Sequence, residues 1–201
     1  MKLYYSPGAC SLAPHIMIRE ASLPADIVKV DLGTKKTEKG DDFSKINPKG
    51  YVPTVQLDNG QVMTEVAVLL QYIADQKPEA KLIPPAGTLD RYREQEWLNF
   101  VATEVHKGFG PLWNPATPDS FKAIVKKKLG DRFALLDKHF STNDFLMGKS
   151  FTAADAYLFT ITNWSAHADV DMTPYKNLNA FRERVGKRPA VQAALKAEGL
   201  V

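Results

Sequence analysis

The sequence contains only one cysteine among its 201 residues, Cys10. A single cysteine cannot form an intrachain disulfide, so nothing in the sequence indicates an oxidising compartment. The sequence also lacks an apolar signal segment at its start, and no apolar run approaches the ~20 residues that a membrane span requires. These absences predict a cytoplasmic protein that has no membrane partner.

A strong charge of either sign is missing as well. Lysine and arginine number 26 against 23 aspartates and glutamates, which gives a net charge of +3. The densest basic runs, at 126–128 and 182–188, fall in helical patterns that favour a solvated face, so no nucleic-acid partner is expected. No metal site is expected either, because the histidines show no ligand spacing with one another or with Cys10. The four histidines are His15, His106, His139 and His167.

The first 81 residues alternate between strand and helix patterns. The Asp58-Asn59-Gly60 sequence between two strand patterns is typical of a hairpin turn. The order strand, helix, strand, helix, strand, strand, helix predicts an α/β layered domain over residues 1–81. The predicted strands are 2–5, 27–31, 54–57 and 61–63, and the predicted helices are 11–21, 42–46 and 65–76.

Beyond Leu82 no further strand is predicted. The Pro84-Pro85-Ala86-Gly87 cluster indicates a linker over residues 82–87. Thr88 then caps a long helix that runs toward Phe109. Residues 88–201 are therefore predicted to form an all-helical domain. Its further helices are expected from Asp119, after Thr152, at 178–185 and at 190–196.

Apolar residues at helical spacing predict which faces of these helices are buried. The Thr152-Ala153-Ala154-Asp155 segment resembles a capping box, which we interpret as structural because both side chains satisfy N–H groups at the helix end. The stripe of the long helix comprises Leu98, Val101, Ala102, Val105 and Phe109, and that of the next helix comprises Phe121, Ile124, Val125, Leu129, Phe133, Leu136 and Phe140.

Cys10 lies where the first strand passes through the Ser6-Pro7-Gly8 turn into a helix. The first N–H groups of a helix have no intrahelical partner, and the helix dipole places positive charge there, so a thiolate is favoured. The position therefore predicts a reactive thiol. The alternative is that Cys10 is a small buried hydrophobic residue, as many cysteines are.

Two further motifs suggest a peptide-like ligand. Pro53 cannot donate to a sheet ladder, so it leaves the backbone of Val52 available to an extended ligand, above all with a cis Val52–Pro53 bond; a trans proline that opens a strand is the alternative. Glu65 and Val66 begin a helix whose N–H groups suit a carboxylate, while the Glu65 carboxylate suits an ammonium group. Ordinary charge complementarity at a helix start is the alternative for Glu65.

These motifs together resemble the cytosolic glutathione S-transferases, in particular the bacterial beta class, and the similarity spans the whole chain. The resemblance implies a thioredoxin-like N-terminal domain and an all-α C-terminal domain. It also implies a homodimer that conjugates glutathione, as co-substrate and without another cofactor, to small apolar electrophiles. The stretches that carry it are 1–5, 7–12, 47–50, 96–100, 104–108 and 154–159.

Two other activities remain open within that family. One is glutathione-dependent reduction of disulfides or peroxides at Cys10, for which the absence of a second cysteine leaves only a monothiol cycle with glutathione as the resolving thiol. The other is a non-catalytic glutathione-binding or interaction module of the same fold.

In the first domain the resemblance implies a set of glutathione contacts. Cys10 would lie beside the glutathione sulfur, Lys35 near the glycyl end, and Val52, ahead of Pro53, in backbone pairing with the cysteinyl unit. Glu65 and Val66 would hold the γ-glutamyl end. Relatives often carry a small or hydroxylated residue at position 66, where Val66 can offer only its backbone N–H. Tyr5 and Ser11 are candidate neighbours of the thiol.

Taken alone, a single helical histidine such as His106 is more often a solvated or structural residue than a proton carrier. The resemblance implies instead that His106 lies close to the cysteine and acts with it. Asn99, Thr103 and His106 are spaced to share one helix face. At position 103 relatives can carry a longer basic residue, so Thr103 offers no charged contact. Such residues can also serve the neighbouring subunit's site. The other implied residues are Glu104 and Lys107 for glutathione, and Phe109 and Trp113 for the electrophile.

Overall fold

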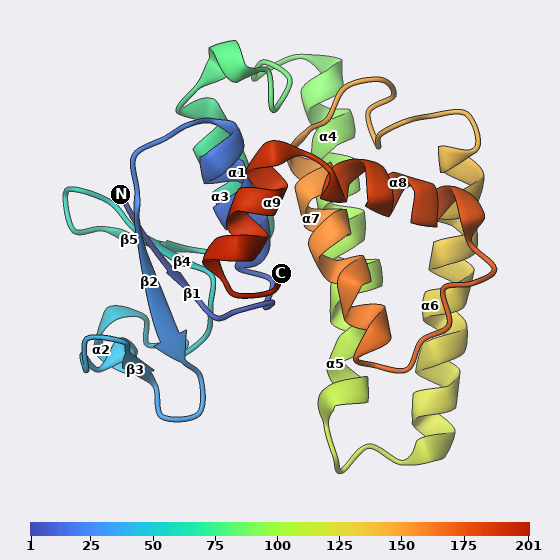
Figure 1. Ribbon diagram of the computed structural model, residues 1–201, viewed down its shortest axis with the longest axis horizontal. Coiled ribbons are helices and arrows are strands. Elements are labelled where there is room, and N and C mark those ends of the chain that lie inside the picture. Colours follow the sequence, from blue (N-terminus) through green and yellow to red (C-terminus); the bar gives the residue numbers. More distant parts are fainter. The chain divides into compact units, whose positions relative to one another are not determined.

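A computed structural model describes residues 1–201, which form two compact units (Figure 1). The first unit comprises Met1–Ile83 and Arg188–Val201, and the second comprises Pro84–Lys187. The chain leaves the first unit inside the predicted linker at 82–87. It also returns at residue 188, whereas the sequence prediction placed all of 88–201 in the helical domain. The return occurs because the last helix packs against the first one.

The first unit is built on a five-stranded mixed sheet with the order β3-β2-β1-β4-β5. The central strand β1 (Lys2–Tyr5) is parallel to β2 (Asp26–Asp31) and antiparallel to β4 (Thr54–Gln56). The edges are β5 (Val62–Thr64), antiparallel to β4, and β3 (Lys36–Thr37), antiparallel to β2. The sequence missed β3, because two residues in a polar loop are too few to show strand alternation.

Helices of the first unit complete this layered structure (Figure 1). Helix α1 (Leu12–Glu20) packs against α3 (Val66–Asp75) and against α9 (Pro189–Ala197), and α2 (Phe43–Ile46) lies near β3. A short 3₁₀ turn, η1 (Pro78–Ala80), follows α3. The predicted α/β architecture of thioredoxin-like type is confirmed. One core cluster of this unit comprises Tyr4, Val28, Val30, Phe43 and Val52.

The second unit is all-helical, as predicted, but its long first helix is not uniform. The predicted helix from Thr88 toward Phe109 is an α-helix as far as Phe100, a π-helix from Val101 to His106, and an α-helix again to Trp113. Hydropathy spacing cannot detect this change, since Val101 and Val105 are buried in the π-helix just as the α-helical stripe predicts. The elements are α4 (Leu89–Phe100), η2 (Val101–His106), α5 (Lys107–Trp113), α6 (Asp119–Phe140), α7 (Ala153–Thr162), η3 (Asn163–Ala166) and α8 (Lys176–Gly186).

The predicted apolar stripe of α6 is correct only in its later turns. Val125, Leu129, Phe133, Leu136 and Phe140 are buried, but Phe121 is 48% exposed and Ile124 is 63% exposed. Helix α8 begins opposite the second half of α6, where the Asp137 carboxylate accepts the Asn177 N–H at 2.7 Å, so the first turns of α6 lack this cover. No helix of the structure combines the length and apolar character needed to cross a membrane.

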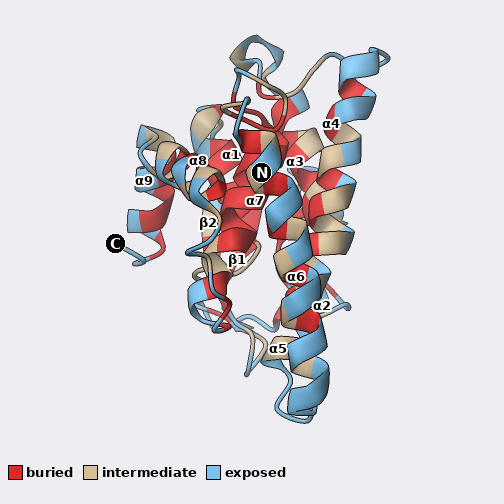
Figure 2. Cartoon of the chain, turned by 90° about the vertical axis from the view of Figure 1, so that its right-hand side faces the viewer, coloured by how far each residue is buried: buried red, intermediate tan, exposed pale blue.

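Helix α7 is buried along its whole length (Figure 2). Two buried carboxylates accept from the backbone at its N-terminus. The predicted capping box is confirmed, since Asp155 Oδ2 accepts the Thr152 N–H at 2.8 Å. Glu94, on α4, accepts the Ala154 N–H at 2.8 Å through Oε1. Both carboxylates are 0% exposed. Burial raises the pKa of Glu94 to about 7, and burial together with the nearby Glu94 raises the pKa of Asp155 to about 7.

We expect Glu94 to make the second unit less stable as the pH rises. The pKa of Glu94 is about 7 in the folded chain against an ordinary 4.5, so the folded state keeps this proton while the unfolded state releases it. The stabilisation that Glu94 contributes is therefore complete below pH 4.5 and is lost as the pH rises toward 7. Urea unfolding across this window should show the wild type losing about 3 kcal/mol relative to Glu94→Gln. If the free energies of unfolding of the wild type and Glu94→Gln changed in parallel with pH, the raised pKa of Glu94 would be contradicted.

Candidate functional site

The thiol of Cys10 lies in the turn between β1 and α1. Helix α1 begins at Leu12, and the backbone N–H groups of Leu12 and Ala13 bond back to the carbonyls of Ala9 and Cys10. The Cys10 side chain is half-buried, and its Sγ donates to the backbone carbonyl of Val52 at 3.4 Å. The structure therefore brings two predicted residues together, the thiol and the residue before Pro53.

Ser11 and Tyr5, the candidate neighbours of the thiol, differ in what they can do. The buried Ser11 hydroxyl accepts the Ser6 N–H at 3.1 Å and donates to the Ser6 carbonyl at 3.2 Å. Ser11 therefore stabilises the turn through two hydrogen bonds to the Ser6 backbone. Burial, and then the charges of Glu198 and Glu38, raise the pKa of Tyr5, which keeps its phenol protonated.

A carboxylate from the far end of the chain anchors this turn. Glu198 Oε2 accepts the Gly8 N–H at 3.0 Å, and Glu198 Oε1 lies 2.9 Å from Nδ1 of His15 on α1. The side chains of Glu198 and His15 are 0% exposed. Gly8 adopts a φ of +69°, which glycine tolerates without strain. The sequence gives no local signal of this contact, because Gly8 and Glu198 lie 190 positions apart.

Two further predicted residues, Val52 and Lys35, lie at or against the loop before β4. The Val52–Pro53 bond is cis, which decides between the two alternatives that the sequence left open, and the Val52 side chain is buried. Lys35 approaches the same loop, because its Nζ donates to the Gly50 carbonyl at 2.7 Å. The ammonium of Lys35 is therefore held two residues from Val52.

Glu65 has an unusual backbone and an exposed carboxylate. It precedes α3 with φ 72° and ψ 116°, a conformation that costs a non-glycine residue about 1–3 kcal/mol and is enriched at functional sites. Its Oε1 accepts from Tyr51 Oη at 2.7 Å and from Lys49 Nζ at 3.1 Å. Val66 is buried, consistent with a contribution from its backbone alone.

Sequence reasoning did not assign a role to Lys49 or Tyr51. The hydrogen bond to Glu65 raises the pKa of both side chains, which favours the charged Lys49 and the neutral Tyr51. The carboxylate of Glu65 therefore already holds an ammonium group, which is the chemistry the sequence predicted for it. The Lys49 pair is exposed, so a ligand ammonium can exchange with it at little cost.

In the second unit, His106 is held by aromatic residues. Its Nδ1 lies 2.6 Å from the hydroxyl of Tyr157, which is buried in α7. The indole of Trp164 meets the imidazole edge-on, with the ring centres 5.0 Å apart. His106 ends the π-helical segment, and helical irregularities of this type are frequent at functional sites.

The other predicted glutathione contacts of this unit make local interactions. The Thr103 hydroxyl donates to the Asn99 carbonyl at 3.0 Å, and Lys107 is exposed. Glu104 Oε2 pairs with Arg132 Nη2 at 2.6 Å, and this contact lowers the pKa of Glu104. The face predicted from α-helical spacing is not preserved, because the π-helix changes the number of residues per turn between Asn99 and His106.

The two residues predicted for the electrophile lie in one aromatic cluster. The rings of Phe109 and Trp113 stack with centres 6.3 Å apart, and both meet Trp164 edge-on. Phe109 is 0% exposed, whereas Trp113 is 46% exposed. Sequence reasoning missed Trp164, which sits in a 3₁₀ turn without a periodic pattern. No group of three or more His, Cys, Asp or Glu side chains could hold a metal ion.

We expect Glu198→Gln to loosen the thiol turn. A glutamine has one acceptor oxygen where the carboxylate has two, so either the Gly8 N–H or Nδ1 of His15 loses its acceptor. The free energy of unfolding should fall by about 2 kcal/mol in urea denaturation. Glu183→Gln makes the same substitution at an exposed position on α8 and is the matched control. It should leave the midpoint of urea denaturation unchanged. Equal midpoints for all three proteins would show that Glu198 does not anchor the turn.

Comparison with known proteins agrees with this geometry. Residues 8–76 match the family model of the glutathione S-transferase N-terminal domain, and residues 100–189 match that of the C-terminal domain. Among curated proteins, the chain is 44% identical over 200 residues to glutathione S-transferase GstA of Escherichia coli O157:H7, with 100% of each chain covered.

Solved structures give the same result. The beta class glutathione S-transferase of Sphingomonas chungbukensis is 49% identical, with a TM-score of 0.96 over 100% of both chains. A sphingomonad glutathione S-transferase complexed with glutathione is 48% identical, also with a TM-score of 0.96 over 100% of both chains. These matches confirm the predicted fold and the resemblance to the bacterial beta class, and the chain belongs to the glutathione S-transferase family.

Proposed function

We propose that this glutathione transferase joins the sulfur of reduced glutathione to small apolar electrophiles, and that its first unit binds the tripeptide. The observation that carries the proposal is the arrangement around the cis Val52–Pro53 bond, where Cys10 contacts the Val52 carbonyl and Lys35 is held at Gly50. Glutathione has a peptide backbone, a thiol, two carboxylates and an ammonium group, and this unit offers a complement to each. The sphingomonad relative complexed with glutathione supports the assignment.

Each end of the tripeptide has a proposed partner. The Val52 backbone pairs with the cysteinyl unit, in the manner of an added strand, and Pro53 keeps that segment turned away from the ladder. The Glu65 carboxylate takes the γ-glutamyl ammonium in exchange for Lys49, while the Val66 N–H at the start of α3 takes the α-carboxylate. Lys35 lies toward the glycyl carboxylate.

Cys10 is proposed to lie beside the glutathione sulfur in its neutral form. Two adjacent thiolates repel each other, so the ionisation of glutathione favours a protonated Cys10. The contact from Sγ to the Val52 carbonyl supports this form, since only a thiol can donate there. His106 is the proposed further group that acts on the glutathione sulfur.

The second unit is proposed to complete glutathione binding and to hold the electrophile. Asn99, Thr103 and Lys107 remain proposed contacts, either in the same subunit or across a homodimer. Glu104 is the weakest of the proposed contacts, because its carboxylate is already paired with Arg132. For the electrophile, the half-exposed ring of Trp113 over the buried Phe109 offers an apolar surface. The cytoplasmic location stays a prediction.

A second activity is proposed from the thiol itself. The Cys10 thiolate would attack the glutathione sulfur of a mixed disulfide between glutathione and another thiol, forming a Cys10–glutathione mixed disulfide and releasing the other thiol as its thiolate. A reduced glutathione would then displace Cys10 and form oxidised glutathione, so that the released thiol is the reduced product. The half-buried position of Cys10 and the lack of any second cysteine favour this monothiol exchange.

Glu65→Gln should weaken glutathione binding, because a neutral amide no longer compensates the ligand ammonium. We expect the KM for glutathione in chlorodinitrobenzene conjugation to rise about 10-fold, as for a lost hydrogen bond to a charged group. Glu79→Gln is the matched control, an exposed carboxylate of the same unit that pairs with Lys77 at 3.3 Å. Equal KM values for the wild type and Glu65→Gln would exclude the proposed contact. Retention on immobilised glutathione without any conjugation would indicate a binding module instead.

Exposure of the chain to oxidised glutathione should add one glutathione, on Cys10. Intact-mass and peptide mass spectrometry measure this adduct, and Cys10→Ala supplies the control that cannot form it. We expect Cys10→Ala to lose disulfide exchange completely and to retain conjugation. If the wild-type protein stayed unmodified, the proposed redox activity would be contradicted. If Cys10→Ala lost conjugation, Cys10 would instead take part in the transfer of glutathione to the electrophile.

A further inference from the structure

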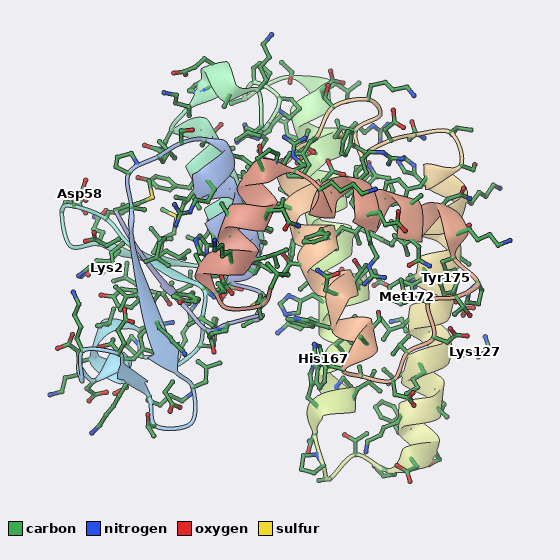
Figure 3. All side chains as sticks on the ribbon, viewed as in Figure 1. Lys2, Asp58, Lys127, His167, Met172 and Tyr175 are labelled. Carbon is green, nitrogen blue, oxygen red and sulfur yellow. The ribbon has the colours of Figure 1, made fainter.

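The second unit contains an open pocket of about 590 Å³, lined by residues of η3, of α8 and of the loop between them. Met172, labelled in Figure 3, belongs to this loop. Two residues of the lining carry a buried polar atom without a hydrogen-bond partner, namely Ser165 at Oγ and Arg182 at Nε. Ser165 is 1% exposed. Because most buried polar atoms in proteins are hydrogen-bonded, two exceptions at one pocket point to a ligand.

The guanidinium of Arg182 has no counter-charge. Its Nη1 and Nη2 donate to the side-chain oxygens of Asn179 at 3.0 Å and of Asn163 at 3.1 Å, and both of these acceptors are neutral. Burial lowers the pKa of Arg182, and no acidic neighbour opposes this effect. An arginine stays protonated even so. A half-buried cation that the chain does not compensate favours an anion beside it.

Two carboxylates at the same pocket already have other partners. Asp169 Oδ2 pairs with Lys126 Nζ at 2.8 Å. Asp171 Oδ1 accepts the N–H of Thr173 at 2.8 Å and its hydroxyl at 2.7 Å. Both aspartates are exposed, so water and salt screen their charges. They therefore neither compensate Arg182 nor exclude an anion next to it.

The remaining residues of the lining are apolar, and they indicate what the anion is attached to. They are Ala166, Val170 and Met172. A carboxylate has two oxygens in one plane, so one can accept from Arg182 Nε while the other accepts from Ser165 Oγ. An apolar body on that carboxylate would cover the three apolar side chains. Mainly apolar walls with a few polar groups are typical of small-molecule sites.

We propose that this pocket binds a small organic carboxylate, which accepts from Arg182 Nε and Ser165 Oγ and packs its apolar body against Val170 and Met172. Both donor atoms are closed to bulk water, so the segment 167–175 has to shift when the ligand enters. That segment contains no helix or strand, and the shift therefore breaks no regular structure. The proposal does not rest on the proposed function, because no residue assigned to glutathione or the electrophile lines this pocket.

Benzoate is the probe, and the Nε–H resonance of Arg182 in ¹⁵N NMR of the full chain is the readout. Arg182→Lys lacks this group and identifies the resonance. We expect benzoate to shift the resonance until it saturates, and benzamide, a neutral molecule of similar shape, to leave it in place. No shift with benzoate, or an equal shift with benzamide, would overturn the proposal. Equal affinity for inorganic phosphate would do the same, since the pocket would then hold an adventitious ion only.

Ser165→Ala tests the hydroxyl without changing the charge of the pocket. We expect the Kd for benzoate to rise about 10-fold, as for a lost hydrogen bond to a charged group. Without benzoate, the midpoint of urea denaturation should stay the same or rise, because the substitution removes a buried hydroxyl that has no partner in the chain. Ser120→Ala, at an exposed position on α6, is the matched control and should change neither quantity. An unchanged Kd in Ser165→Ala would exclude the site.

A titration at saturating reduced glutathione separates this site from the proposed glutathione site. The Kd for benzoate should be the same with and without glutathione. A Kd that rises with glutathione would place benzoate at the glutathione site and overturn the proposal. Failure of the proposed function would look different, since a protein without conjugation activity would still give the benzoate titration.

Discussion

The buried carboxylate of Glu198 is the contact on which the geometry of the thiol turn depends. It accepts the Gly8 N–H on one side and faces the His15 imidazole on the other, out of contact with water. Buried polar groups are tolerated when they are hydrogen-bonded, so these three groups hold one another in place. The last residues of the chain therefore belong to the unit that carries Cys10, and they fix the turn from which its thiol projects.

The second unit is organised around α7 in a comparable way. Its backbone at the N-terminus is satisfied by two buried carboxylates, one from Asp155 and one from Glu94 on α4. Near its middle, Tyr157 meets His106. A proposed functional side chain thus contacts a helix that has no exposed residue.

The proposed glutathione contacts of the first unit were largely predictable because each one leaves a local signal. A cysteine at a helix start, a proline that opens a strand and an acidic residue before a helix are all recognisable within a few positions. The partners of these residues were not predictable. Lys49 and Tyr51 reach Glu65 from a loop, and neither belongs to a periodic pattern. The side-chain geometry of a loop depends on backbone turns that hydropathy does not encode.

The sequence by itself determined the α/β and all-helical halves and the helix boundaries near the caps, because propensity and capping act over short distances. It also determined that Cys10 has no second cysteine to pair with in the chain. Only the tertiary structure decided that α9 packs with the first unit and that Phe121 and Ile124 are exposed. It also decided that a π-helix turns His106 toward Tyr157. These features depend on contacts between residues far apart in the chain, where burial and hydrogen-bond satisfaction outweigh local preference.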